Sequence, residues 1–225
     1  GARYADDRAA YVFRDPKTAA HFKGLNAFFG NECSVTLYDV SADENRYLFL
    51  LSGPREAGAY YYYGRAAKRF DNLGLRQPWL TPERLAPVET LKVTTKDGLT
   101  LGAYLTVPLT PGPHPLVVLP HGGPEVRDTL DFDLFAQTFA AQGWLVLQPN
   151  FRGSGGFGQA FADAGRKHWG DLMQQDVEDA VAQVLATGRV SPGKVAICGA
   201  SYGGYAALMG AVRKPDLYRA VVSIA

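Results

Sequence analysis

The chain has 225 residues, 47% of them apolar, which is enough to bury the core of one good-sized domain and part of another. Lys and Arg number 23 against 22 Asp and Glu, and neither sign forms a long block, so we expect a soluble globular protein with no nucleic-acid or membrane partner. Two cysteines without a CxxC pair exclude a disulfide framework, and we expect no metal and no cofactor.

The first stretch, "GARYADDRAAYVF", lacks the basic head and apolar run of a signal peptide. No run of the sequence approaches the ~20 apolar residues that a membrane helix needs. Because the chain starts in mid-pattern, a cytoplasmic location and a periplasmic or secreted one both stay open.

Residues 1–75 are expected to form a β-meander. From Tyr11 to about Phe70, short runs rich in aromatic and β-branched residues alternate with turn residues, as in "SVTLYDVS", "RYLFLLSG" and "AYYYYGR". Such strands fit one blade of a β-propeller or the edge of a sandwich, and either needs neighbours to cover its faces. Residues 74–90 hold three prolines and no clean period, which predicts a linker and a second domain at 76–225.

After the linker the pattern changes to that of an α/β domain. "ETLKVTT" and "LTLGAYLTVP" predict a hairpin whose turn at Asp97-Gly98 needs positive φ. Four short runs without alternation follow, which is typical of parallel strands covered on both faces: "PLVVLP", "WLVLQP", "KVAICG" and "RAVVSIA". Apolar periodicity predicts helices between them, at about 132–140, 171–185 and 202–213. The expected fold class is therefore a doubly wound α/β sheet.

A serine between glycines follows the third of these strands. Residues 199–203, "GASYG", spell G-x-S-x-G with an apolar strand before and a helix after, as a nucleophile elbow requires. The turn places Ser201 at a helix N-terminus, where the helix dipole and free N–H groups favour developing negative charge. The alternative interpretation is an ordinary glycine-rich turn.

Two further glycine-rich loops follow strand ends. "LPHGGPEVRD", residues 119–128, can supply an oxyanion-binding N–H, with Tyr202 supplying the other. His121 is either a general base or, as we expect, a brace for the turn. "NFRGSGGFG", residues 150–158, lacks a P-loop lysine and a dinucleotide fingerprint, so a site-shaping loop is favoured over a phosphate cradle. Its Arg152 is a candidate substrate-binding residue, the alternative being a structural ion pair.

Five motifs in this order resemble the prolyl oligopeptidase family, in particular its acylaminoacyl peptidase and dipeptidyl peptidase members: "HGGP", "NFRGSGGFG", "WG", "DVEDA" and "GASYGGYAAL". The tyrosine-rich stretch "AGAYYYYGRAAKRFDNLG" is similar to the last propeller blade of those enzymes. The resemblance implies an α/β-hydrolase sheet, Ser201 as nucleophile, and the N–H groups of Gly123 and Tyr202 as the oxyanion hole.

The family's other two triad members, an aspartate and then a histidine, follow the serine by many tens of residues. Here 24 residues follow Ser201, with no histidine and with Asp216 as their one acid. All four histidines precede the serine. We therefore expect a C-terminally truncated piece whose partner is the remainder of the same protein, with an open sheet edge at "RAVVSIA" and an unactivated serine.

The expected activity of the parent protein is that of a serine peptidase acting on short peptides. A carboxylesterase is the first alternative, because an elbow and an oxyanion loop serve esters and amides alike. The second is a non-catalytic fragment that acts by association. The peptide specificity and the formation of a homo-oligomer stay open.

Overall fold

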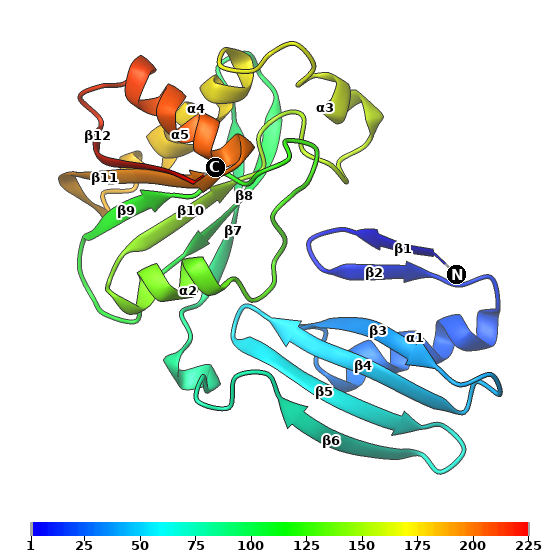
Figure 1. Cartoon of the computed structure of the whole chain (residues 1–225). Coiled ribbons are helices and arrows are strands. Elements are labelled where there is room, and N and C mark those ends of the chain that lie inside the picture. Colours follow the sequence, from blue (N-terminus) through cyan, green and yellow to red (C-terminus); the bar gives the residue numbers. More distant parts are fainter. Residues whose placement is uncertain (1, 225) are drawn as a thin grey trace. The chain divides into compact units, whose positions relative to one another are not determined.

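The computed structural model describes residues 2–224 and divides the chain into two compact units, each with its own apolar core (Figure 1). Unit 1 takes the chain up to Leu85 together with residues 129–133, and unit 2 takes residues 86–128 and the chain from Leu134 onward. The chain passes from one unit to the other after Leu85, within the proline-containing stretch 74–90 and ten residues beyond the expected boundary at 75/76.

Unit 1 is built on a four-stranded antiparallel sheet. Its strands lie side by side in chain order: β3 (Ser34–Val40), β4 (Arg46–Gly53), β5 (Glu56–Gly64) and β6 (Arg69–Leu75). A short hairpin of β1 (Ala2–Ala5) and β2 (Ala9–Val12) precedes it. A sequential antiparallel sheet is the building unit of a propeller blade, and the place of this sheet at the end of a propeller stays a prediction.

Unit 1 also contains a helix in the region from Tyr11 onward, where only strands were expected. Residues Pro16–Phe28 form α1, and Asp15 caps it by accepting hydrogen bonds from the backbone N–H and the hydroxyl of Thr18 at 2.8 and 2.7 Å. Proline at the first helical position after an aspartate N-cap is a start signal that was available in the sequence. Phe22 and Leu25 bury the inner face of α1 among the aromatic side chains of the sheet.

Unit 2 contains a six-stranded mixed sheet in the order β12-β11-β9-β10-β8-β7. The strands are β7 (Val88–Thr94), β8 (Thr100–Thr106), β9 (His114–Val118), β10 (Leu145–Pro149), β11 (Val190–Ala200) and β12 (Tyr218–Ile224). β7 and β8 form the predicted hairpin, in which Gly98 has φ +88° and donates to the carbonyl of Thr95 at 2.9 Å. β8 is antiparallel to β10, and the pairs among β9, β10, β11 and β12 are parallel, as predicted.

Helices cover both faces of this sheet, with α4 (Leu172–Ala186) and α5 (Tyr202–Arg213) on one face and α2 (Leu134–Ala141) on the other (Figure 1). A short helix that the sequence pattern does not predict, α3 (Gln159–Asp163), precedes α4. The fold of unit 2 is therefore the doubly wound α/β-hydrolase sheet. In the part of the chain that the structure describes, no helix has both the length and the apolar character needed to cross a membrane.

The strand order brings the two predicted site loops together. β9 lies between β10 and β11 and is parallel to both. The chain places β10 on one side of β9 and then crosses to place β11 on the other side, so the strand order reverses at β9. Ligands bind at such switch points, outside the carboxyl ends of the strands. The loop after β9 holds His121 to Asp128, and the turn after β11 holds Ser201, so both lie at this edge of the sheet.

Candidate active site

Ser201 forms the turn between β11 and α5 in a strained conformation. Its φ of 55° and ψ of −123° lie in a region that residues with a side chain rarely adopt. Two backbone hydrogen bonds fix the turn: the N–H of Ser201 donates to Ile224 at 2.8 Å, and its carbonyl accepts from Tyr205 at 3.0 Å. The residue is exposed, so the strain presents its hydroxyl group at the start of α5.

The glycines around Ser201 are required by close backbone contacts. A Cβ atom on Gly199 would overlap the backbone of Gly203, and one on Gly203 would overlap the carbonyl oxygen of Pro120. A Cβ atom on Gly204 would lie 2.7 Å from the hydroxyl oxygen of Ser223. The turn is as tight as the G-x-S-x-G pattern predicts, because a larger residue at any of these positions would force strand, helix and loop apart.

The strain at Ser201 predicts an unusual stability change. Ser201→Gly is expected to raise the free energy of unfolding by about 1–2 kcal/mol, since glycine adopts this conformation without steric cost. Ser201→Ala removes the same hydroxyl group but keeps the Cβ atom, so its stability should stay close to that of the unmodified chain. Urea unfolding of the three proteins measures the difference. Equal stability of the glycine and alanine variants would show that the turn stores no strain.

The loop after β9 lies directly against the elbow. A Cβ atom on Gly122 would be 3.2 Å from the carbonyl oxygen of Ala200 and 3.6 Å from the Cβ of Ser201. Gly123 follows with φ +110°, which favours glycine. Neither its N–H nor the N–H of Tyr202 donates a hydrogen bond to any residue between 2 and 224. Both groups can therefore take up a new hydrogen-bond acceptor, and the N-terminus of α5 places its positive dipole end beside Ser201.

His121 braces this loop, as the sequence interpretation preferred. Its Nδ1 donates to the carbonyl of Gly122 at 2.8 Å, and its Nε2 hydrogen-bonds the hydroxyl of Ser154 at the same distance. The imidazole stacks on Phe151 with the ring centroids 4.3 Å apart. Burial lowers the pKa of His121 to about 4, and the charge of Arg127 acts in the same direction. With both nitrogens engaged and the ring 9% exposed, His121 is part of the scaffold.

The buried imidazole predicts how stability depends on pH. Because the folded state holds the pKa of His121 below its unfolded value, the stabilisation is complete above about pH 6.5 and is lost as the pH falls toward 4. We expect this loss to be on the order of 2–3 kcal/mol. Unfolding free energies of the unmodified chain and of His121→Gln, compared from pH 7 to 4, isolate it from the titration of carboxylates. If the unfolding free energies of the two proteins change with pH in parallel, the loss of stability does not come from His121.

The glycine-rich loop at residues 150–158 is hydrogen-bonded to the loop after β9. Asn150 accepts from the N–H of Asp128 at 2.8 Å, and its amide donates back to the carbonyl of the same residue at 3.2 Å. The N–H of Gly155 donates to the carbonyl of Val126 at 3.0 Å. These bonds fix residues 150–155 against residues 126–128, which agrees with a loop that shapes the site.

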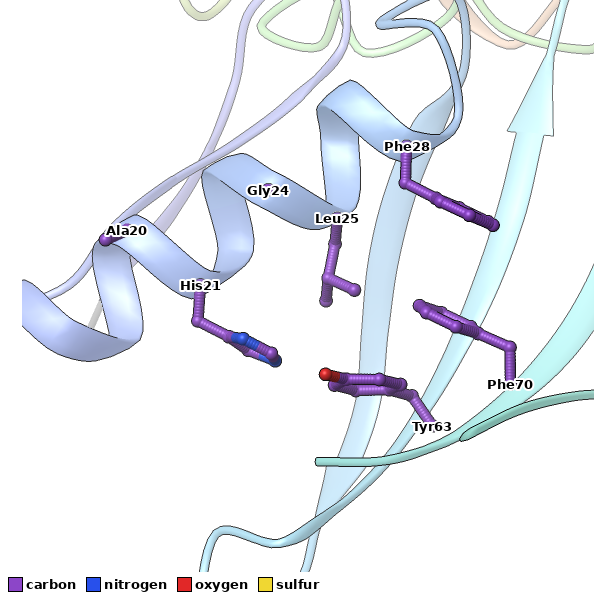
Figure 2. A pocket seen from close by; sticks show the side chains of 7 residues that line it. All are labelled: Ala20, His21, Gly24, Leu25, Phe28, Tyr63 and Phe70. Atoms are coloured by element: carbon purple, nitrogen blue, oxygen red, sulfur yellow. The ribbon is translucent and has the colours of Figure 1, made fainter. Parts of the chain in front are cut away.

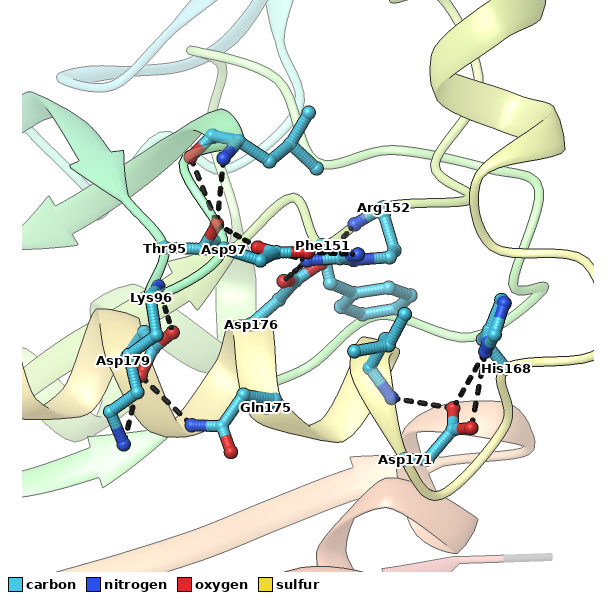
Figure 3. A network of polar contacts seen from close by, with 12 residues as sticks. Thr95, Lys96, Asp97, Phe151, Arg152, His168, Asp171, Gln175, Asp176 and Asp179 are labelled. Carbon is cyan, nitrogen blue, oxygen red and sulfur yellow. Dashed lines mark hydrogen bonds and ion pairs between the residues drawn. The ribbon is translucent and has the colours of Figure 1, made fainter.

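Arg152, the predicted substrate-binding residue, lies in an ion-pair network (Figure 3). Its guanidinium donates two bonds to Asp97, at 2.8 and 2.9 Å, and two to Asp176, at 2.8 and 2.7 Å. Burial raises the pKa of Asp176, and the bonds from Arg152 oppose that rise, whereas the same guanidinium holds the pKa of Asp97 well below its usual range. Only 4% of Arg152 is exposed, so its contacts agree with a structural ion pair and not with substrate binding.

The histidines of unit 2 have partners other than Ser201. His114 stands at the start of β9, opposite Val190 and away from the carboxyl ends, with its Nδ1 bonded to the carbonyl of Gly143. His168 pairs with Asp171 at 3.1 Å (Figure 3). Between residues 2 and 224, no histidine hydrogen-bonds the hydroxyl of Ser201, and no group of three or more His, Cys, Asp or Glu side chains could hold a metal ion.

Aromatic side chains beside the elbow were not singled out by the sequence analysis. The ring of Trp169 packs edge-on against Tyr202 at 5.1 Å and lies 6.1 Å from Tyr205, one helical turn after Ser201. Trp169 is 57% exposed. The motif "WG" at residues 169–170 entered the sequence analysis only as part of the family resemblance. These rings give the site an apolar surface next to the serine that can hold an apolar group of a substrate.

Comparisons with known proteins agree with this geometry. The model of the prolyl oligopeptidase family matches residues 130–225. The chain is 35% identical to "Dipeptidyl aminopeptidase BIII" of Pseudoxanthomonas mexicana, over 93% of the chain and 32% of that protein. It is 37% identical to the "Acylamino-acid-releasing enzyme" of Homo sapiens, over 56% of the chain and 18% of that protein. The chain thus spans about a third or less of the length of these relatives.

Solved structures give the same result. The structure of a puromycin-hydrolyzing peptidase of Mycobacterium tuberculosis superposes on 80% of this chain and 29% of its own, with a TM-score of 0.71 and 26% identity. An acylaminoacyl peptidase of Pyrococcus horikoshii shares the fold, with a TM-score of 0.69 and 20% identity over 83% of the chain. By the family match, by these similarities and by its α/β-hydrolase fold, the chain belongs to the prolyl oligopeptidase family.

Proposed function

We propose that the chain carries the nucleophile and the oxyanion-binding groups of a serine peptidase that hydrolyses short peptides. The observation that carries the proposal is the strained Ser201 turn, held against the His-Gly-Gly loop at the carboxyl edge of the sheet. The oxygen of Ser201 attacks the scissile carbonyl carbon while a base takes the hydroxyl proton; the C–N bond then breaks, the amine half leaves with that proton, and the acyl group stays as an ester on Ser201. Water, deprotonated by the same base, then hydrolyses the ester, which releases the carboxylic acid and restores the serine hydroxyl. The N–H groups of Gly123 and Tyr202 donate to the oxyanion that forms in each step.

In this proposal the general base and the acid that orients it come from polypeptide beyond these 225 residues. Two observations support this: the histidines of unit 2 have other partners, and the relatives are about three times as long as the chain. β12 lies at the edge of the described sheet, with Val222 and Ile224 about half exposed, and is the strand to which a further strand would add. By itself, Ser201 is then an unactivated alcohol.

For unit 1 we propose the end of a β-propeller that precedes the hydrolase domain. Its four strands form one blade-like antiparallel sheet, and the similarity to the dipeptidyl aminopeptidase covers nearly the whole chain. A propeller next to the hydrolase domain would restrict substrates to short peptides.

A carboxylesterase is the second candidate, because the same turn and loop serve both kinds of acyl transfer. The exposed Trp169 beside Tyr202 and Tyr205 is an apolar surface that suits an ester as well as a peptide side chain.

The test compares substrates on the longer polypeptide that contains this chain. A dipeptidyl anilide with a free amino group, an acylated aminoacyl anilide and a matched short-chain ester are each assayed, with Ser201→Ala as the control. The proposal expects hydrolysis of at least one anilide, with loss of at least 10³-fold in the Ser201→Ala variant. Hydrolysis of the ester alone would favour the carboxylesterase, and unchanged activity of the variant would exclude Ser201 as the nucleophile.

A further inference from the structure

Apolar surfaces lie open to solvent in both units. In unit 1, a pocket of about 330 Å³ opens between α1 and the strands β5 and β6, with Tyr63 and Phe70 in its wall (Figure 2). In unit 2, Trp169 is 57% exposed and Tyr205 is 37% exposed. The residues that line the pocket do not identify its occupant. The surface in unit 2 adjoins the proposed nucleophile, so the substrate of Ser201 is the molecule that can cover it.

Trp169 is held in place by two tyrosine rings and by its own loop. Its indole packs edge-on against the ring of Tyr202, with the centroids 5.1 Å and the planes 69° apart, and lies 6.1 Å from the ring of Tyr205. A Cβ atom on Gly170, the next residue, would lie 2.5 Å from the hydroxyl oxygen of Tyr205. The carbonyl of Gly170 accepts a hydrogen bond from Nη1 of Arg213 at 3.3 Å. These contacts fix the loop before α4 against α5.

The ring of Tyr202, against which Trp169 packs, is itself part of the core. Tyr202 is 6% exposed, and its hydroxyl donates to Sδ of Met173 at 3.6 Å. On its other contact, the ring of Phe151 lies 5.4 Å away. The exposed indole is therefore held by a buried ring. A substrate group can pack on it without ordering a mobile side chain first, which lowers the entropic cost of binding.

Tyr202 also joins this surface to the reacting atoms. Its backbone N–H is one of the two proposed oxyanion donors, and its ring contacts Trp169. Tyr205 lies one helical turn after Ser201, and its N–H donates to the carbonyl of Ser201 at 3.0 Å. A carbonyl oxygen bound at the N–H of Tyr202 therefore brings the substrate residue that carries it next to the aromatic surface. That residue stays attached to Ser201 in the ester, so a contact of its side chain is available in both steps.

We propose that Trp169, together with Tyr205, determines specificity and binds an aromatic side chain on the substrate residue whose carbonyl group Ser201 attacks. The inference rests on the proposed function of Ser201 and adds to it the class of substrate. An aromatic side chain gains the burial of its apolar area and also the edge-to-face or offset packing that rings prefer. A methyl group in the same place would cover only a small part of the indole.

Binding is measured on the longer polypeptide in its Ser201→Ala form, so that the result does not depend on catalysis. Calorimetric titration compares N-acetyl-phenylalanine amide with N-acetyl-alanine amide, and we expect the first to bind about ten-fold more tightly. Adding Trp169→Ala should abolish most of this preference, and Trp169→Phe, which keeps a ring against Tyr202, should retain most of it. Val212→Ala is the matched control, because Val212 is an apolar residue, 73% exposed, near the other end of α5.

Turnover gives a second readout that a purely structural role would not change. With p-nitrophenyl esters of the same two acetylated amino acids, kcat/KM should be about ten-fold higher for phenylalanine than for alanine, and Trp169→Ala should lower this ratio several-fold. A residue that only stabilises the fold would lower both values by the same factor.

The inference is overturned if the phenylalanine ligand binds no more tightly than the alanine ligand, or if Trp169→Ala keeps the preference. It is also overturned if Val212→Ala loses the preference equally. A binding preference that depends on Trp169, found together with no turnover of either ester, would contradict the proposed function of Ser201 and leave the aromatic surface as a binding site.

Discussion

Arg152→Met is expected to lower the free energy of unfolding by about 3–5 kcal/mol at neutral pH. The substitution leaves the fully buried carboxylate of Asp176 with the backbone N–H of residue 152 but without the guanidinium that neutralises its charge. An uncompensated buried charge costs more than the ion pair contributes, because its hydration is lost without replacement.

The same variant should show a characteristic pH dependence, which chemical unfolding from pH 4 to 8 measures. Burial raises the pKa of Asp176, and without Arg152 that rise is opposed less. The loss of stability should therefore be smallest at the acid end of the range, close to the unfolded pKa of 3.8, and should grow as the pH rises from there toward the raised folded pKa.

Two controls separate the buried charge from a general effect of losing an arginine. Arg166→Met removes an exposed pair with Asp163 and should cost less than about 1 kcal/mol. The double variant Arg152→Met with Asp176→Leu leaves no buried charge and should recover most of the lost stability. If the double variant is as unstable as Arg152→Met, the loss of stability comes from disturbed packing and the electrostatic explanation is wrong.

Gly203→Ala is expected to destabilise the chain by about 3 kcal/mol and to displace the oxyanion loop. The new Cβ atom would overlap the carbonyl oxygen of Pro120, with a second backbone oxygen, that of His121, 3.2 Å away. Backbone atoms of a packed loop cannot move aside as the end of a side chain can. Thermal unfolding measures the stability, and amide shifts of Gly122 and Gly123 report the loop.

The matched control is Gly102→Ala in β8. A Cβ atom there meets only a ring carbon of Phe157, at an ordinary distance of 3.9 Å, and the backbone needs no positive φ. Alanine should be neutral or slightly stabilising at this position, since it reduces the freedom of the unfolded chain. A loss for Gly203→Ala no larger than that for Gly102→Ala would contradict the close approach of Pro120 to α5.

The strands of unit 2 and the serine turn could be predicted because their signals are local. Apolar runs without alternation predict parallel strands. Gly199 and Gly203 flank Ser201 at positions where a nucleophile elbow has no room for a side chain, so their spacing predicts the turn. The role of Arg152 could not be settled in this way, because Asp176 and Asp97 lie 24 and 55 residues away along the chain and meet it only in the folded sheet.

In unit 1, helix α1 was overlooked because its apolar residues form only a weak helical pattern, in which Phe22 and Leu25 are the buried ones, although Asp15 and Pro16 mark its start. The aromatic surface at Trp169 was missed for a different reason. Its position next to Tyr202 depends on how the loop before α4 packs against α5, which no local pattern encodes.

The central claim is that Ser201 is a nucleophile whose base lies outside this chain. Labelling with a fluorophosphonate probe, mapped by peptide mass spectrometry, tests it on the 225-residue chain and on the longer polypeptide, each with a heat-denatured sample. We expect the probe to modify Ser201 in the folded longer polypeptide and to leave the 225-residue chain unmodified. Modification of the isolated chain at Ser201 would contradict the origin of the base, and a folded longer polypeptide without modification at Ser201 would contradict the claim itself.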